Sequence, residues 1–314
     1  MAEDLHVVFG AGQIGRGLVN HLARLGLAAR AVSRRRPIGL DSVVQWRAAE
    51  ATDPDAATEA SAGATVIYQC LNAPYTRWPQ VFPPMQRGVL SAAERTGALL
   101  VTLENLYGYG PTGGRPMTED LPLAATTVKG SIRTEMTQEL LAAADQGRLR
   151  IAIGRASDFF GPGVTESTLD ETFFGNAIAG RPAKFLGNPD LLHSYSYVPD
   201  VVAGLATLGT DRRAIGQVWH LPIPETVTTR AILALVAREI GRPVGIRSPS
   251  RLARWALALA NPMRRALAEM AYEVDQPFVV DTGKYRSTFG AAGTPLAEAI
   301  AVTVAGYRSL VLSS

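Results

Sequence analysis

A strand, a glycine-rich turn and an amphipathic helix open the chain and restrict the folds available to it. Residues 5–9, LHVVF, predict a short buried strand, and Gly10, Gly12 and Gly15 follow with the spacing G-x-G-x-x-G. The following helix carries its apolar face at Ile14, Leu18, Leu22 and Leu25. Residues 27–33 predict a second strand, so the first forty residues predict a βαβ unit.

The glycine spacing also indicates a phosphate ligand at this turn. Gly10 permits the tight turn, Gly12 lets a pyrophosphate approach the backbone, and Gly15 lets the helix pack on the strand. The N-terminus of the helix supplies amide donors and a positive dipole end. A glycine-rich turn without a ligand is the alternative, but the flanking strand and helix are the context that a dinucleotide site requires. We therefore expect Gln13 and Ile14 to contact a dinucleotide together with the three glycines.

Alternating strands and helices continue through the first half of the chain. Further strands are predicted at 42–51, 64–72, in the first half of 97–110 and at 148–157, with helices at 78–96 and from the region of residue 129 to 147. Such alternation predicts an α/β fold with a doubly wound parallel (Rossmann) sheet that is covered on both faces.

After residue 157 the sequence is richer in loops, and the predicted helices are 227–241, 250–260 and 263–272. We expect residues 1–156 to form an NADP-binding Rossmann domain, to which 191–221 contribute the last helix and strand. Residues 157–190 and 222–314 are expected to form a smaller, mainly substrate-binding C-terminal lobe.

The end of the predicted second strand favours NADP over NAD. An acidic residue about 20 residues after the glycines would bind the ribose 2′-hydroxyl of NAD. This chain has Ser33, Arg34, Arg35 and Arg36 there, and the nearest acid is Asp41. Arginine pairs with phosphate in a bidentate manner, so Ser33, Arg34 and Arg35 are expected to bind the 2′-phosphate of NADP. A solvated basic loop is the alternative.

Three further residues complete the expected cofactor site. Asp53 follows the predicted third strand and is placed to accept a hydrogen bond from the adenine amino group. Its alternative role is that of a helix N-cap. Leu71 and Asn72 end the predicted fourth strand, and we expect both to contact the dinucleotide.

Composition argues against several other classes of protein. The net charge is +3 with scattered cations, whereas nucleic-acid binders gather Lys and Arg on one face. The single cysteine, Cys70, excludes an internal disulfide, and no histidine spacing indicates a metal site. The chain shows neither a signal peptide nor the roughly 18 consecutive apolar residues of a membrane span. We expect a soluble cytoplasmic protein that binds neither nucleic acid nor membrane.

Four motifs together resemble the extended short-chain dehydrogenase/reductase family, also called the NAD-dependent epimerase/dehydratase family. They are VVFGAGQIG, LYGYGP, GRASDFFGPG and HSYSYVPDVVAGL, and they span most of the chain. The resemblance implies a Rossmann domain with a C-terminal substrate lobe and a small-molecule substrate. It also makes a homodimer plausible.

The resemblance implies a Tyr-x-x-x-Lys pair on the helix after the fifth strand, and this chain departs from it. With Glu135 matched to a family glutamate, Thr127 occupies the tyrosine position and Ser131 the lysine position. Family strands also end here in serines, one of which holds the substrate oxygen; this chain offers Thr102 or Glu104 nearby. The chain is therefore identified as an atypical member.

Lys129, one of only three lysines, is a candidate replacement. If the helix already includes Thr127, Lys129 lies about 200° round it from Thr127 and cannot replace the family lysine. If the helix starts at Lys129, its side chain can reach the nicotinamide ribose, although a lysine on a helix flank is usually solvated. The helix is expected to bury Val128, Ile132, Met136 and Leu140.

Three more residues can act as acids or bases, or can simply be packed. Tyr107 follows the fifth strand, where the family tyrosine is mostly structural. Asp158 replaces a family asparagine that often touches substrate, and His193 replaces an arginine that grips nucleotide-sugar phosphate, which argues against a nucleotide-sugar substrate. The candidate catalytic residues are Lys129, Tyr107, Thr127, Thr102 and Asp158.

The leading hypothesis is an NADP-dependent oxidoreductase acting on a small, fairly apolar carbonyl or enone compound, because aromatic residues are frequent around the predicted site. A non-redox epimerase, cyclase or lyase that uses Asp158, Glu104 or His193 is the second. A non-catalytic NADP-binding sensor is the third.

Overall fold

The structure is a computed structural model that describes residues 4–250, 252–254 and 261–312. The chain divides into two compact units. The first comprises Met1–Gly108, Leu123–Arg155 and Val201–Leu221, and the second Tyr109–Pro122, Ala156–Asp200 and Pro222–Ser314. Residues 109–122, 156 and 191–200 were expected in the first domain but belong to the second unit.

A seven-stranded parallel sheet forms the centre of the first unit. Its strands are β1 Leu5–Phe9, β2 Ala28–Ser33, β3 Gln45–Ala48, β4 Ala64–Gln69, β5 Leu99–Glu104, β6 Arg150–Arg155 and β11 Gln217–His220. Their order is β11-β6-β5-β4-β1-β2-β3, so the winding reverses beside β1, between β2 and β4. This order confirms the predicted doubly wound Rossmann fold.

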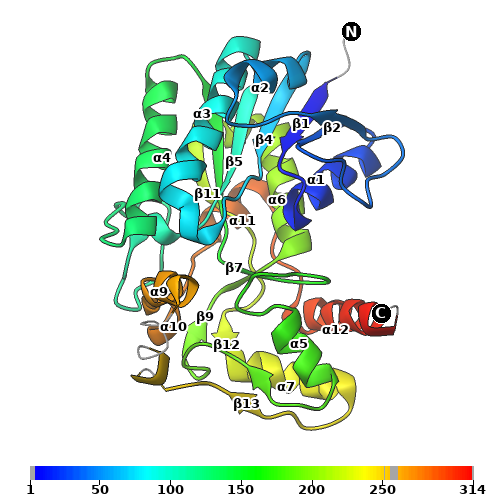
Figure 1. The fold of residues 1–314 in the computed structure, drawn as a ribbon, viewed down its shortest axis with the longest axis vertical. Helices are drawn as coiled ribbons and strands as arrows, with labels where there is room; N and C mark the ends of the chain where they lie inside the picture. The colour runs from blue at the N-terminus through cyan, green and yellow to red at the C-terminus, as the bar shows by residue number, and fades with distance from the viewer. Residues whose placement is uncertain (1–3, 251, 255–260, 313–314) are drawn as a thin grey trace. The chain divides into compact units, whose positions relative to one another are not determined.

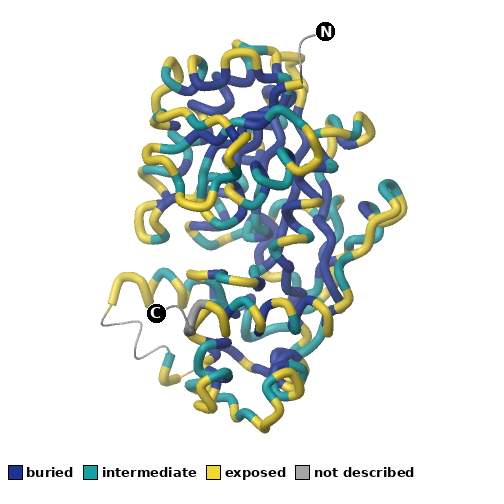
Figure 2. Tube along the Cα trace, turned by 90° about the vertical axis from the view of Figure 1, so that its right-hand side faces the viewer, coloured by how far each residue is buried: buried dark blue, intermediate teal, exposed yellow. Residues whose placement is uncertain are grey.

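Helices cover both faces of this sheet (Figure 1). Helices α1 Gln13–Arg24 and α6 Val198–Thr210 lie on one face, and α2 Pro54–Ala60, α3 Trp78–Thr96 and α4 Val128–Asp145 lie on the other. All five residues of β1 are buried, as expected for a strand covered on both faces. The trace along the central strands is accordingly buried in Figure 2, whereas the edge strand β3 is largely exposed.

The second unit is built from short strands and helices. The strands are β7 Asp158–Phe160, β8 Ala183–Lys184, β9 Leu192–His193, β10 Tyr195–Tyr197, β12 Val227–Thr228 and β13 Ile246–Arg247. The helices are α5 Glu171–Ile178, α7 Thr229–Ile240, α9 Pro262–Ala268, α10 Tyr272–Asp275, α11 Gly283–Phe289 and α12 Leu296–Leu312. The rings of Phe173, Phe174 and Tyr307 pack in its core.

The predicted helices of this unit are corrected in several places. The region 263–272 forms α9 and begins α10 rather than one helix, and most of 250–260 lies outside the described residues. Helices α5, α11 and α12 lie where no helix was predicted.

The described residues also form three 3-10 helices: η1 Tyr75–Arg77, η2 Tyr107–Tyr109 and η3 Arg212–Ala214. No helix among the described residues is long and apolar enough to span a membrane.

Candidate functional site

The glycine turn leaves free space at only one of its three glycines. Gly10 adopts φ +92°, and a Cβ on it would lie 2.5 Å from the carbonyl oxygen of Cys70. A Cβ on Gly15 would overlap the carbonyl oxygen of Gly10. A Cβ on Gly12 would meet nothing within 4 Å. Packing therefore explains Gly10 and Gly15, whereas Gly12 borders open space that a pyrophosphate can occupy.

The N-terminus of α1 is electrostatically suited to an anion. Gly12 is its N-cap, and neither a capping side chain nor an acidic first-turn residue is present in the described chain. Helices α2 and α5, in contrast, have Asp53 and Asp170 as N-cap residues, whose carboxylates accept hydrogen bonds from first-turn amides. The positive end of the α1 dipole is thus left for an external anion such as a phosphate. Gln13 and Ile14 form the start of this helix.

The basic segment after β2 is exposed. The Ser33 hydroxyl donates to the Arg35 carbonyl oxygen at 2.8 Å and accepts from Trp46 Nε1 at 3.1 Å, which fixes the backbone of the turn. The side chains of Arg34, Arg35 and Arg36 are exposed and make no ion pair with the described residues. Their guanidinium groups are therefore available to a ligand phosphate.

The other expected cofactor residues lie at the same edge of the sheet. Asp53 Oδ1 accepts hydrogen bonds from the amides of Asp55 at 2.9 Å and Ala56 at 3.1 Å, so its N-cap role is confirmed. Its contact with adenine stays a prediction. Leu71 is half-buried and Asn72 exposed, directly beyond the end of β4.

The start of α4 lies between the two alternatives considered for Lys129. Thr127 is the N-cap, and its hydroxyl accepts a hydrogen bond from the Gly130 amide at 3.1 Å. The helix begins at Val128, which is 61% exposed, so Val128 was wrongly expected on the buried face. The buried face instead includes Lys129, Arg133 and Thr137 beside Ile132, Met136 and Leu140. Lys129 is buried, not solvated as lysines on helix flanks usually are.

Lys129 and Tyr107 both meet a residue that the sequence analysis missed. The Lys129 Nζ lies 4.4 Å from the ring centroid of Tyr75, a cation–π contact. The Tyr75 hydroxyl lies 3.4 Å from the Tyr107 hydroxyl. A signal for this cluster exists in the sequence, because Tyr75, Trp78 and Phe82 recur at helical spacing.

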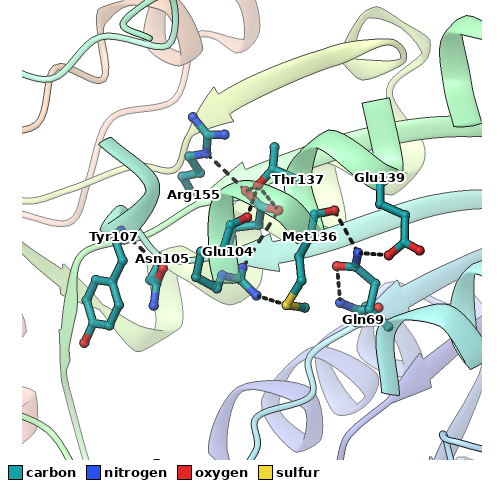
Figure 3. A network of polar contacts seen from close by, with 10 residues as sticks. Gln69, Glu104, Asn105, Tyr107, Met136, Thr137, Glu139 and Arg155 are labelled. Carbon is teal, nitrogen blue, oxygen red and sulfur yellow. Dashed lines mark hydrogen bonds and ion pairs between the residues drawn. The ribbon is translucent and has the colours of Figure 1, made fainter. Parts of the chain in front are cut away.

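Glu104 belongs to a buried network of polar contacts (Figure 3). Its carboxylate accepts from Thr137 Oγ1 at 2.9 Å to each oxygen and from Arg155 Nε at 3.2 Å, and it lies 3.9 Å from Arg133. Desolvation lowers the pKa of Arg133, and Glu104 opposes this effect. The carboxylate thus braces β5, β6 and α4, which leaves it poorly placed as a free base.

Thr102 is completely buried in β5. Its hydroxyl has no hydrogen-bond partner among the described residues, and the same holds for the Oε1 atom of Gln69, its register partner on β4. A substrate-binding role for Thr102 stays a prediction.

Asp158 lies in the second unit, whereas the other four catalytic candidates lie in the first. Its Oδ2 contacts His193 Nε2 at 3.1 Å and accepts a hydrogen bond from Thr168 Oγ1 at 3.1 Å. The imidazole of His193 stacks on Tyr195, with ring centroids 4.2 Å apart. Burial, assisted by the charge of Asp158, raises the pKa of Glu273 well above its ordinary value. No group of three His, Cys, Asp or Glu side chains within the described ranges is arranged to hold a metal ion.

Comparisons with known proteins agree with this architecture. The family model described as NAD dependent epimerase/dehydratase family matches residues 6–221. No curated protein matches the chain. UDP-glucuronic acid 4-epimerase from Bacillus cereus, solved with NAD, is 14% identical with a TM-score of 0.78, over 98% of this chain and 99% of that one.

Two further solved structures share the fold at similarly low identity. UDP-glucose 4-epimerase from Thermotoga maritima, solved with UDP-glucose, is 15% identical with a TM-score of 0.79, over 98% of this chain and 99% of that one. UDP-glucose 4-epimerase from Thermus thermophilus, solved with NAD, is 18% identical with a TM-score of 0.76, over 97% and 99%. The family match covers more than half of the sequence, and the chain belongs to the NAD dependent epimerase/dehydratase family.

Proposed function

We propose that the chain binds NADP in its first unit and catalyses hydride transfer to a small, fairly apolar carbonyl or enone compound. The observation that carries this proposal is the glycine turn: Gly10 and Gly15 are required by packing, but Gly12 borders open space at an uncapped helix N-terminus. That combination fits a pyrophosphate and has no structural purpose of its own.

The choice of NADP rests on the segment after β2. An acidic residue that would bind the ribose 2′-hydroxyl of NAD is missing there, and Arg34 and Arg35 are exposed. Two guanidinium groups can pair with a 2′-phosphate and balance its charge. NAD is the competing cofactor, because NAD is present in the Bacillus cereus and Thermus thermophilus structures.

The cofactor, when bound, supplies or accepts the hydride. The glycine turn and the first turn of α1 would hold its pyrophosphate, Arg34 and Arg35 its 2′-phosphate, and Asp53 its adenine. The aromatic side chains of Tyr75, Trp78 and Tyr107 gather beyond the carboxyl ends of β4 and β5, where ligands bind in doubly wound sheets. Their apolar surface supports a substrate with little charge.

Epimerisation is the second candidate. The family name and the UDP-sugar epimerases of similar fold favour it. In such a reaction a hydride taken by the cofactor returns to the substrate, so the cofactor is not consumed.

Turnover of NADPH distinguishes the two candidates. Purified protein is incubated with NADPH and a panel of aldehydes, ketones and enones while the nicotinamide absorbance is recorded and products are identified. Stoichiometric loss of NADPH with a reduced product supports the reductase. Isomerised product without loss of absorbance supports the epimerase, and the absence of both reactions contradicts the proposal.

A further inference from the structure

Two cations on α4 face two aromatic rings of the segment that follows β4. Lys129 and Arg133 are four residues apart and therefore lie on one helix face. Lys129 Nζ lies 4.4 Å from the ring centroid of Tyr75, and the Arg133 guanidinium carbon lies 5.0 Å from that of Phe82. Both cations are at most 5% exposed. This face of α4, which differs from the face of the family positions Thr127 and Ser131, thus carries two buried cations.

The phenol of Tyr75 is paired with a second phenol. Its hydroxyl lies 3.4 Å from that of Tyr107. Trp78 holds both rings, because it packs edge-on against Tyr75 with centroids 5.5 Å apart and stacks on Tyr107 with centroids 5.8 Å apart. Trp78 itself is buried and donates to the Ala73 carbonyl oxygen at 3.0 Å. The two hydroxyl groups are therefore held together by a rigid aromatic frame.

Buried cations lie beside this pair of phenols. Lys129 contacts the ring of Tyr75, and Arg133 interacts with Tyr107 and with the buried carboxylate of Glu104. Burial lowers the pKa of Arg133, while Glu104 and the Tyr107 phenol act in the opposite direction. A nearby cation stabilises a phenolate relative to the neutral phenol. The surroundings thus favour transfer of a proton away from this pair.

The tyrosines belong to the same rigid unit as the cofactor turn. The glycine turn leaves β1, the Tyr75 segment leaves β4, and Tyr107 follows β5. These three strands are adjacent and parallel, so their carboxyl ends meet at one edge of the sheet. The glycine turn also contacts the residue that follows β4, because Gly10 lies against the carbonyl oxygen of Cys70.

We propose that Tyr75 is the proton donor of the reaction, with Tyr107 as its hydrogen-bond partner and Lys129 as a positioning residue that stabilises its phenolate. This inference rests on the proposed hydride transfer. NADPH, when bound, would supply the hydride to the carbonyl carbon, and the electron pair of the carbonyl double bond would move to oxygen. That oxygen would take the proton of the Tyr75 hydroxyl, which would leave a Tyr75 phenolate beside the alcohol and NADP⁺. A proton from the solvent would then restore the Tyr75 hydroxyl.

The residues at the family positions leave room for such a replacement. Thr127, at the tyrosine position, uses its hydroxyl to cap α4. The chain contains no Tyr-x-x-x-Lys sequence at all, because the residues four places before its three lysines are Ala125, Gly180 and Val280. A tyrosine contributed by another segment therefore restores the missing phenol.

The test is an ultraviolet absorbance titration of phenolate in the protein without cofactor. In the wild type we expect one tyrosine to ionise below the ordinary value of about 10, because a nearby cation stabilises the phenolate. This early phase should disappear in Y75F, move to higher pH in K129M and persist in K129R. Y197F is the matched control and should leave it unchanged, because burial raises the pKa of Tyr197. Circular dichroism checks that each variant is folded.

Kinetics connect the titration with catalysis. We expect Y75F to lower kcat with NADPH by about 10²- to 10⁴-fold, with little change in the affinity for NADPH. K129M should shift the pH profile of kcat upward, and K129R should restore most of the wild-type profile. No early phase in the wild type, or an early phase that survives in Y75F, would overturn the assignment of Tyr75 even if NADPH is consumed. Failure of the wild type to bind NADPH would overturn the proposed function, and the role of Tyr75 with it.

Discussion

Replacing Glu104 by Gln should destabilise the first unit strongly. The substitution keeps the side-chain shape but removes the carboxylate that contacts the guanidinium groups of Arg133 and Arg155, which are 3% and 4% exposed. Removing one partner of a buried ion pair costs about 3–5 kcal/mol in free energy of unfolding. For a unit of this size the melting temperature should fall by roughly 10 °C.

Urea unfolding provides the assay for E104Q. Three of the four tryptophans, Trp46, Trp78 and Trp219, lie in the first unit, so their fluorescence follows its unfolding. The control is D55N, which removes the partner of the exposed Arg95 and should cost at most about 1 kcal/mol. A loss for E104Q no larger than that for D55N would refute the argument that Glu104 neutralises two buried cations.

Two other perturbations test separate parts of the account. In G12A the added methyl group enters the space assigned to pyrophosphate, so dinucleotide affinity should fall at least tenfold while stability changes little; G15A should impair folding, because its Cβ overlaps Gly10. Equal effects of both variants on melting temperature would contradict this distinction. Burial raises the pKa of Glu273 in the folded state above its pKa of about 4.3 in the unfolded state. The free energy of unfolding should therefore decrease as the pH rises from about 4.3 towards the pKa of the folded state, because the unfolded state loses its proton first. E273Q should abolish that decrease and be more stable than wild type at neutral pH, as thermal unfolding across pH would show.

The central sheet was predictable because local patterns determine it. The strand, glycine turn and helix at residues 5–24 satisfy propensity, periodicity and turn chemistry together, and the repeated alternation fixes a parallel sheet. The helix α12 was also readable, since Leu296, Ile300, Thr303 and Tyr307 recur on one face, yet it was missed. In α5, glycine and the surrounding loop-rich sequence masked the signal of its N-cap Asp170.

The candidate site was less predictable because its contacts join distant segments. The N-cap role of Thr127 could have been inferred from its residue type before a helix. The burial of Lys129 could not, since it depends on how the segment after β4 packs against α4. The sequence likewise identifies Tyr107 as a candidate, but the helical spacing around Tyr75 does not show that Tyr75 contacts Tyr107, which lies 32 residues later.

Calorimetric titration of the protein with NADPH and NADH tests the central claim most directly. The account predicts micromolar binding of NADPH and much weaker binding of NADH. The double substitution R34A/R35A should weaken NADPH binding at least tenfold and leave NADH unchanged, whereas the exposed-arginine control R212A should behave as wild type. Equal affinity for both cofactors would contradict the NADP assignment. Binding of neither would contradict the nucleotide site itself.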